Sequence, residues 1–402
     1  MKPVTFIHCA DLHLDSPFLG LKSFPRQIYE TIQKSTFHSF SKIVNEAIDR
    51  QVDFLIIAGD LYDGEDRSIR AQIFFQREME RLNEVGIPVF VVHGNHDHLG
   101  GNWTRISTPK NVHIFSKDVE CKQIITKNGC KVNLYGFSYE KKHIEEAPLS
   151  QYEKKDGADY HIGILHGHDQ QNENHYRYAP FHVHELLEKE FDYWALGHIH
   201  KSNILHKDPY ILYPGNIQGR HRKELGDKGC YLVELGKSET HLQFLSTATI
   251  RWEHFRLPKD LNFKTFEALY QSCLKVKEEF RKTDQHIFVE LSLNKSQINQ
   301  TFINQFSKED LLFLLQEGEE NQRNFVWVYN VHIIESERSP SIEGPFFEEL
   351  HELFMNLDDL SEHISLLYQN PKTRKYLDEL TSDEKNMIIH DAEKLLFDLL
   401  KE

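Results

Sequence analysis

Five short apolar runs in this chain are each followed at once by a cluster of histidine, aspartate or asparagine, and this feature constrains the fold most. The clusters are HCADLH at 8–13, AGDLYD at 58–63, HGNHDH at 93–98, LHGHD at 165–169 and LGHIH at 196–200. One such cluster alone is ordinary turn composition. Five of them, each after a predicted strand, indicate strand ends that converge, because an open α/β sheet places its sites at the carboxyl edge.

The first hundred residues alternate short apolar runs with longer amphipathic ones. We expect strands at 4–9, 53–60 and 87–94, and helices at 26–50 and 67–86. In the first helix the apolar residues Ile28, Ile32 and Phe40 recur at helical spacing, and the second ends at Gly86. This β-α-β-α-β alternation predicts a sheet with helices on its faces.

The chain then becomes rich in strands up to about residue 250. Apolar runs at 131–138, 160–168, 192–200, 210–216, 229–236 and 241–247 are separated by polar loops. We interpret them as a second sheet that packs on the first. Residues 1–250 are therefore predicted to form one domain.

The pattern changes after residue 250. Strands interleave with a helix at 262–282, and the run at 324–334 is a further strand, so 251–338 is predicted to be a small α+β domain. The segment 335–345 has the composition of a linker, and 346–402 has a helical pattern. Residues 339–402 are accordingly predicted to be a linker and a helical tail.

Charge and cysteine usage exclude several classes of protein. The net charge is −15, of which residues 1–250 contribute −4 and residues 251–402 contribute −11. This argues against a surface that grips nucleic acid everywhere. The five cysteines are scattered, which fits reduced thiols in a cytoplasmic protein. No apolar run reaches the length of a membrane span, and no secretion signal opens the chain.

The donor types in the clusters suit a pair of divalent cations. Imidazoles and carboxylates together favour Mn, Fe or Zn, and the lack of a thiolate disfavours a structural zinc site. Asp60 can bridge two ions, Asn95 offers a neutral oxygen, and strand alternation points His198 and His200 the same way. Two ions on the order of 3.5–4 Å apart clamp an in-line displacement at phosphorus and lower the pKa of a bound water to about 7.

The motifs also resemble those of a known superfamily. Asp11-Leu-His13, Gly59-Asp60-x-x-Asp63, Gly94-Asn95-His96-Asp97, His166-Gly167-His168 and Gly197-His198-x-His200 are similar to the calcineurin-like metallophosphoesterase signature. CADLHLDSPF, HGNHD, LGHIH and YPGN resemble the SbcD-type nuclease subunit of DNA repair complexes, in its YhaO-like bacterial subgroup. The resemblance implies a four-layer α-β-β-α sandwich over about the first 220 residues.

The resemblance implies a role for each matching residue. The first ion would be held by Asp11, His13, Asp60 and His200, and the second by Asp60, Asn95, His166 and His198. His96 would be the general acid that protonates the leaving oxygen, with Asp97 orienting it. His93 and His98 are predicted to be ordinary structural residues.

Four further positions are predicted to support the site. Some related nucleases carry a histidine at the position of Asp63 that helps to place the substrate, and the aspartate here cannot take that role. We interpret Asp63 and His168 as residues behind the metal ligands, or in the case of Asp63 as a turn residue. Tyr213 and Asn216, in YPGN, form either a plain turn or an element that faces the nucleotide.

The leading functional hypothesis is a two-metal phosphodiesterase that cleaves DNA as an exonuclease or endonuclease, with manganese the most expected metal. The unit at 251–338 resembles a capping domain that selects DNA ends. The helices at 346–402 would either cover a core or dock on an SbcC-type coiled-coil ATPase. The helices at 26–50 and 67–86 would pack on the sheet, and in the nuclease family such helices also pair across a homodimer.

Two other hypotheses stay open at this point. A phosphoesterase of small molecules would use the same ligands, and only the extra 150 residues after the core and the YPGN element argue against it. A non-catalytic adaptor subunit is the third hypothesis. It is disfavoured because all seven ligand positions and His96 are intact.

Overall fold

The computed structural model describes residues 3–18, 24–64, 67–170, 178–299 and 307–334, with the single positions 388, 389, 392 and 396. Residues 1–334 form one compact unit and residues 335–402 a second. The predicted linker and most of the helical tail lie outside the described residues. Among the helices that are described, none is long and apolar enough to cross a membrane.

The first sheet has six strands in the order β12-β11-β1-β2-β3-β4. Their bounds are β1 Val4–Cys9, β2 Phe54–Ala58, β3 Val89–Val92, β4 Val112–Ile114, β11 Gly229–Leu235 and β12 Thr240–Ser246. β1 to β4 run parallel, whereas β11 and β12 are antiparallel to their neighbours. The parallel core confirms the alternation predicted for the first hundred residues.

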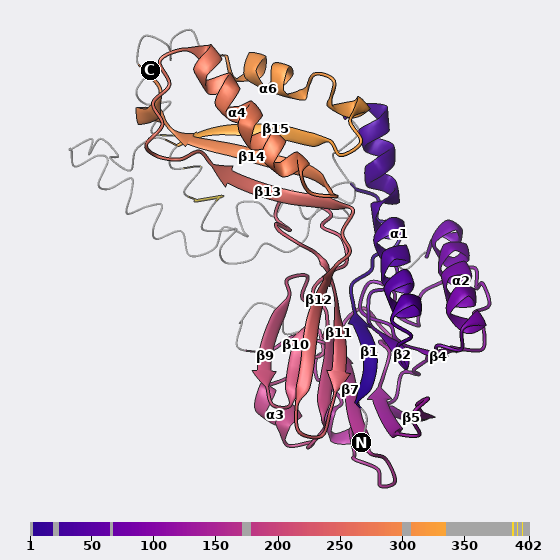
Figure 1. The fold of residues 1–402 in the computed structure, drawn as a ribbon. Helices are drawn as coiled ribbons and strands as arrows, with labels where there is room; N and C mark the ends of the chain where they lie inside the picture. The colour runs from indigo at the N-terminus through magenta and orange to yellow at the C-terminus, as the bar shows by residue number, and fades with distance from the viewer. Residues whose placement is uncertain are drawn as a thin grey trace. The chain divides into compact units, whose positions relative to one another are not determined.

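Two helices cover one face of this sheet, α1 (Arg26–Asp49) and α2 (Ile69–Glu84) (Figure 1). The apolar stripe of α1 is buried with Val91 and Cys230 of the sheet. α2 begins where the Ser68 side chain accepts a hydrogen bond from the Ala71 backbone N–H, an ordinary N-cap. Both helices lie where the apolar spacing predicts them.

The second sheet also has six strands, in the order β5-β6-β7-β8-β10-β9. Their bounds are β5 Glu120–Ile125, β6 Lys131–Gly136, β7 Tyr160–His166, β8 Tyr193–Gly197, β9 Asn203–Lys207 and β10 Tyr210–Tyr213. The four central strands are parallel, and β5 and β9 are antiparallel edge strands.

The two sheets pack face to face around one apolar core. Phe6, Ile56 and Val92 of the first sheet and Ile162, Tyr193 and Leu212 of the second belong to this core. The outer face of the second sheet is covered by aromatic side chains of loops and by the five-residue helix α3 (Val183–Leu187). Within the described residues the mixed α/β fold is confirmed, and its outer helical layer is thinner than expected because loops take its place.

A third sheet follows, with three parallel strands in the order β13-β14-β15. The bounds are β13 Ile250–Arg256, β14 His286–Asn294 and β15 Val326–Ile334, with helices α4 (Phe266–Arg281) and α6 (Lys308–Gln316). The helices share a core with this sheet through Leu269, Cys273, Leu311 and Leu315. Its other face belongs to an aromatic cluster that includes Trp252, Phe288 and Trp327.

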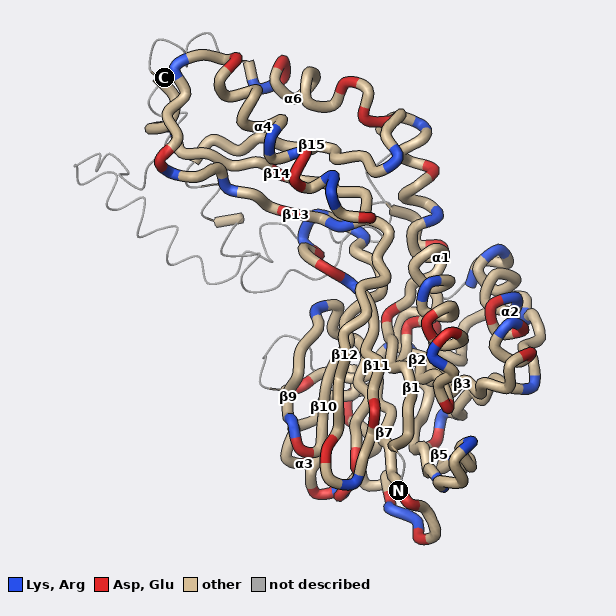
Figure 2. Tube along the Cα trace, viewed as in Figure 1, with Lys and Arg blue, Asp and Glu red and all other residues tan. Residues whose placement is uncertain are grey.

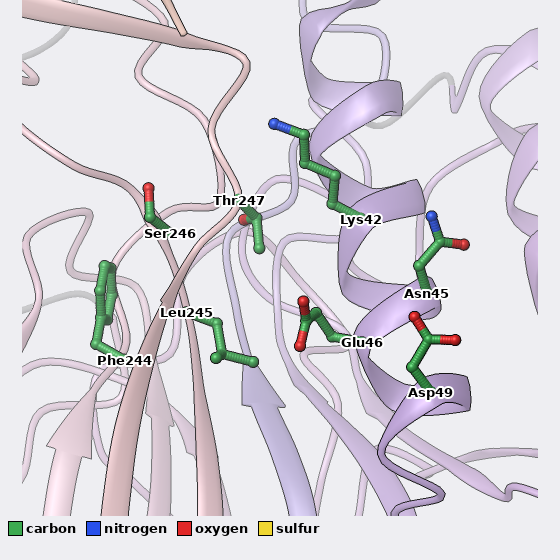
Figure 3. A pocket seen from close by; sticks show the side chains of 8 residues that line it. All are labelled: Lys42, Asn45, Glu46, Asp49, Phe244, Leu245, Ser246 and Thr247. Carbon is green, nitrogen blue, oxygen red and sulfur yellow. The ribbon is translucent and has the colours of Figure 1, made fainter. Parts of the chain in front are cut away.

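Neither the distribution of charged residues on α1 and α2 nor the groove beside α1 marks the predicted site. Basic and acidic residues interleave along both helices (Figure 2). A groove between α1 and β12 is lined by Lys42, Asn45, Glu46, Asp49, Phe244, Leu245, Ser246 and Thr247 (Figure 3). None of these eight residues is a predicted site residue, so the groove is separate from the polar clusters.

Candidate metal centre

The five polar clusters meet where strands of both sheets end. β1, β2 and β3 are parallel in the first sheet, β7 and β8 are parallel in the second, and β2 packs against β7 and β8. Six predicted ligands lie in the loops after β1, β2, β3 and β8, namely Asp11, His13, Asp60, Asn95, His198 and His200, and the seventh, His166, is the last residue of β7. Packing of one sheet on the other therefore brings together residues that are far apart in the sequence, such as His13 and His200, which are 187 positions apart.

Backbone hydrogen bonds tie the first two loops together. The Asp11 N–H donates to the Gly59 carbonyl at 3.0 Å, and the His13 N–H donates to the Asp60 carbonyl at 3.0 Å. Asp11, His13, Asp60 and His198 all have positive φ angles, of 50°, 41°, 48° and 104°. Such angles strain non-glycine residues and persist only where the surrounding structure imposes them, which is typical of functional sites.

Two glycines of the motifs are required by close approach. A Cβ on Gly94 would lie 2.3 Å from Asp60 Oδ1 and 2.6 Å from His166 Nε2. A Cβ on Gly197 would collide with the Ala58 carbonyl oxygen. The polar side chains can therefore approach one another only because these two positions are glycine.

The first donor group contains Asp11, His13 and His200, whose ligand atoms all lie within 4.8 Å of one another. The Nε2 atoms of His13 and His200 are 3.2 Å apart. A carboxylate lies behind each ring, because Asp63 Oδ1 is 2.9 Å from His13 Nδ1 and Glu224 Oε1 is 2.7 Å from His200 Nδ1. A carboxylate at Nδ1 keeps the proton there and turns the Nε2 lone pair toward the site.

The second donor group is centred on Asn95. Its Oδ1 is 3.1 Å from His166 Nε2 and 3.2 Å from His198 Nδ1. Asp60 Oδ2 is 3.5 Å from His166 Nε2 and 3.8 Å from His13 Nε2, so this carboxylate lies between the two groups. The His166 Nδ1 is 3.0 Å from the Ala58 carbonyl, which leaves Nε2 to face the site.

The electrostatics of the site follow from burial and from the donors themselves. Burial, followed by the charge of Arg220, lowers the pKa of His13 to about 3, so this imidazole is neutral as a metal ligand must be. Burial acts to raise the pKa of Asp60, but the nearby His166 and His96 hold it well below its ordinary value. Burial acts to lower the pKa of His166, and the Asp60 carboxylate outweighs it and raises that pKa to about 9.

These donors fit divalent transition metals. Each group offers imidazole nitrogens with carboxylate or amide oxygens, and the three potential metal clusters found among the described residues contain no cysteine. Nitrogen and oxygen donors without thiolates suit Mn, Fe or Zn in a catalytic setting. Asp11, His13 and His200 would hold one ion, Asn95, His166 and His198 the other, and Asp60 would lie between them.

His96 lies at the border of the first donor group. Its backbone N–H donates to Asp60 Oδ1 at 3.0 Å, and its ring centroid is 4.9 Å from that of His13. Its side chain is also close enough to form a potential metal cluster with His13 and Asp63. The position agrees with a proton donor beside the predicted ions, and the metal content of a His96 variant distinguishes this role from that of a ligand.

Asp97 does not make the contact expected of it. Its Oδ2 is 2.7 Å from His93 Nδ1, and its carboxylate accepts the backbone N–H groups of Leu61, Tyr62 and Gly94. No contact of this carboxylate with His96 is found. The expected pairing of Asp97 with His96 is thus replaced by a pairing with His93, because the tight turn points the carboxylate back into the loop after β2.

Asp63 lies against His13, a predicted metal ligand. Besides His13 it contacts the Ser16 hydroxyl, which donates to Oδ2 at 3.2 Å, and the Arg220 guanidinium. Burial acts to raise its pKa, and His13 and Arg220 together lower it to about 2. Arg220 and Glu224 themselves were not predicted from the sequence, since they lie in RHRKE at 220–224, which has the composition of a solvated charge run.

The other supporting positions are buried within the fold. Tyr213 is 1% exposed and donates its hydroxyl to the Gly167 carbonyl at 2.8 Å. Asn216 is 0% exposed and donates to the Gln218 carbonyl at 3.0 Å. These contacts agree with the alternative of a plain turn. His168 is buried with its ring 6.0 Å from that of His198, a predicted ligand.

Comparison with known proteins shows which family and which individual proteins this chain is similar to. Residues 4–202, which contain all five clusters, match the family model described as calcineurin-like phosphoesterase. The chain is 38% identical over 405 residues to the metallophosphoesterase YhaO of Bacillus subtilis, covering 100% of this chain and 99% of that protein. It is 25% identical over 282 residues to the DNA double-strand break repair protein Mre11 of Methanocaldococcus jannaschii, covering 67% and 72%. It is 29% identical over 252 residues to the protein of the same name in Sulfurisphaera tokodaii, covering 58% and 60%.

Proposed function

The chain belongs to the calcineurin-like phosphoesterase family, and from this premise we propose that it is a two-metal phosphodiesterase that cleaves DNA. One observation carries the proposal. Seven donor side chains from the ends of five strands converge in two groups, with Asp60 between them. Phosphodiester hydrolysis by two metals needs this kind of arrangement.

In the proposed reaction the cations and the side chains of the protein have different roles. Two divalent cations, when bound, supply an activated water and stabilise charge on the phosphoryl oxygens. Asp63 and Glu224 orient His13 and His200 through their Nδ1 atoms. His96, half-buried beside the first group, holds the proton that the leaving oxygen takes up. Asp97 and His93 stiffen the turn that carries His96.

DNA is supported as the substrate by the relatives. Two proteins of DNA double-strand break repair are similar over 282 and 252 residues of alignment, more than the residues matched by the family model. We further propose that residues 251–338 form a capping domain, that manganese is the resident metal and that the chain acts as a cytoplasmic homodimer. The partner proposed for the tail at 339–402 is an SbcC-type coiled-coil ATPase.

The test is a nuclease assay with the full chain. Protein loaded with Mn²⁺ or Mg²⁺ is incubated with linear single- and double-stranded DNA, with free and blocked ends, and with bis(4-nitrophenyl) phosphate. We expect Mn²⁺-dependent cleavage of DNA that the His96→Ala variant lacks. Cleavage of the small ester alone would replace the proposal by a small-molecule phosphodiesterase. Full metal loading without turnover on any ester would instead favour an adaptor.

A further inference from the structure

The loop 219–226, between β10 and β11, carries two charged side chains that reach the first donor group. Glu224 is 7% exposed, and its Oε1 is 2.7 Å from His200 Nδ1. Its Oε2 accepts the Arg220 backbone N–H at 2.6 Å. Glu224 therefore links the backbone of this loop to the ring of a predicted metal ligand.

Arg220 extends the link to the other imidazole of this group. Its guanidinium donates to Asp63 Oδ1, the atom that lies 2.9 Å from His13 Nδ1. Its other terminal nitrogen is 3.8 Å from Glu224 Oε1. One loop thus supplies the carboxylate behind His200 and the cation that holds the carboxylate behind His13.

The two ends of the loop are held by a single residue of the third sheet. The Trp252 indole N–H donates to the Gly219 carbonyl at 3.2 Å, and the Trp252 carbonyl accepts the Gly226 N–H at 2.9 Å. Trp252 is buried, and its ring stacks on Phe288 of β14 with centroids 4.6 Å apart. A change in the position of β13 must therefore move Gly219, Gly226 or both.

A second contact fixes the start of β13 to the beginning of the same loop. The buried Gln218 accepts the N–H groups of Thr249 and Ile250 at 2.9 Å and 3.1 Å, and donates to the Ile250 carbonyl at 2.7 Å. Amide pairs of this kind hold two segments in register, since breaking them leaves buried polar groups unpaired. The loop is thus anchored to the third sheet at both ends and to the metal ligands in its middle.

We propose that the loop 219–226 is a positioning device through which Trp252 sets the geometry of the first metal position. The inference rests on the proposed metal centre and assigns Arg220, Glu224 and Trp252 as positioning residues. Groups that orient metal-binding imidazoles commonly change metal affinity by about 10- to 100-fold when they are replaced. The third sheet and the metal centre are then coupled, because displacement of one changes the other.

The test measures binding of Mn²⁺ to the full-length metal-free protein by calorimetry, with free Mn²⁺ followed by electron paramagnetic resonance. Glu224→Gln and Arg220→Gln are expected to weaken one of two sites by about 10- to 100-fold and the other by less than about twofold. Arg220→Lys, which keeps the positive charge, should lose less Mn²⁺ affinity than Arg220→Gln. Trp252→Phe keeps the aromatic packing and loses the indole N–H, and should weaken the same site by about three- to tenfold.

Trp327→Phe is the matched control, because Trp327 lies in the same sheet and the same aromatic cluster. We expect it to leave both affinities unchanged, and the melting temperature of each metal-free variant reports whether it folds. Unchanged affinities in folded Glu224→Gln and Trp252→Phe would overturn the inference, as would equal weakening of both sites. A wild-type protein that binds no Mn²⁺ would overturn the proposed function itself and this inference with it.

Discussion

The Nε2 atoms of His13 and His200 lie 3.2 Å apart, although a carboxylate holds the Nδ1 of each ring. Two imidazoles fixed in this way point lone pairs at each other, and a shared cation relieves the repulsion. The alternative is a buried hydrogen bond between the rings, in which one ring carries a proton at Nε2, either in place of the Nδ1 proton or in addition to it. The relationship therefore supports the first donor group as a candidate cation site.

Asp60 is expected to govern both metal positions. Because its carboxylate lies between the two donor groups, Asp60→Asn should lower the bound Mn²⁺ from two ions to at most one, with a loss of affinity above about 100-fold. Metal content after dialysis, measured by mass spectrometry, checks this. Asp49→Asn, at an exposed position on α1, is the control and should keep both ions. Retention of two ions by Asp60→Asn would refute the bridging role.

His96→Ala separates catalysis from metal binding. A general acid contributes about 10²- to 10⁴-fold to the rate, so kcat should fall by that factor while both ions stay bound. Turnover and metal content are measured on the same preparation. His241→Ala, at an exposed position of β12, should behave as wild type. Loss of an ion in His96→Ala would instead make His96 a ligand, in line with its closeness to His13 and Asp63.

Gly94 is expected to tolerate no side chain. In Gly94→Ala the added methyl would lie 2.3 Å from Asp60 Oδ1, so the loop must shift and both metal affinities should fall by more than about tenfold. Gly64→Ala is a matched control in the loop after β2, since its Cβ would meet nothing within 4 Å. Calorimetry with Mn²⁺ on the two variants checks the difference. Equal affinities would show that the loop adapts.

Asp97 and His93 are expected to act as a unit. Asp97→Asn and His93→Gln should each lower the free energy of unfolding by about 1–3 kcal/mol, because a buried charged hydrogen bond is weakened. The double variant should lose less than the sum, with a coupling energy of at least about 0.5 kcal/mol. Urea unfolding of the three metal-free variants measures this. Strict additivity would contradict the pairing of the two side chains.

His286 predicts a pH dependence of stability. Burial, with the charges of Lys42 and His38 on α1, lowers its pKa to about 4, and its Nδ1 accepts the Phe325 N–H at 3.3 Å. Between pH 6.5 and 4 the unfolded chain binds a proton that the folded chain does not. Stability from this residue is therefore fully present above pH 6.5 and falls toward pH 4, by at most about 1.4 kcal/mol per pH unit.

The variant His286→Gln keeps an acceptor for the Phe325 N–H and removes the titration. Its free energy of unfolding should depend less on pH than that of wild type between pH 4 and 6.5, as measured by urea unfolding across that range. His241→Gln, at an exposed site, should follow the wild-type curve. Parallel curves for His286→Gln and wild type would show that the ring titrates normally.

Local patterns predicted most of the regular structure. The strands β1, β2, β3, β7 and β8 and the helices α1 and α2 lie where the apolar runs and the helical spacing place them. The edge strands β4, β5 and β9 were not predicted, because edge strands are short or half-exposed and carry little apolar pattern. The helix α6 was missed for a similar reason, since it spans only nine residues.

Some residues of the candidate site could also be predicted from the sequence, and others could not. The sequence could name seven candidate ligands, because each lies at or shortly after the end of a strand and carries a metal-binding atom: Asp11, His13, Asp60, Asn95, His166, His198 and His200. The partners of these ligands could not. Glu224 lies 24 positions from His200, and Arg220 lies 157 positions from Asp63, so no local pattern connects them.

By itself the sequence determined most of the elements and the donor types of the candidate centre, because side-chain periodicity and donor identity are local properties of the chain. Only the tertiary structure decided which carboxylate stands behind which imidazole, that Asp97 pairs with His93, and that Tyr213 and Asn216 are buried. Those outcomes depend on how two sheets and a third pack together. Packing is set by the sum of many distant contacts, which no single stretch of sequence records.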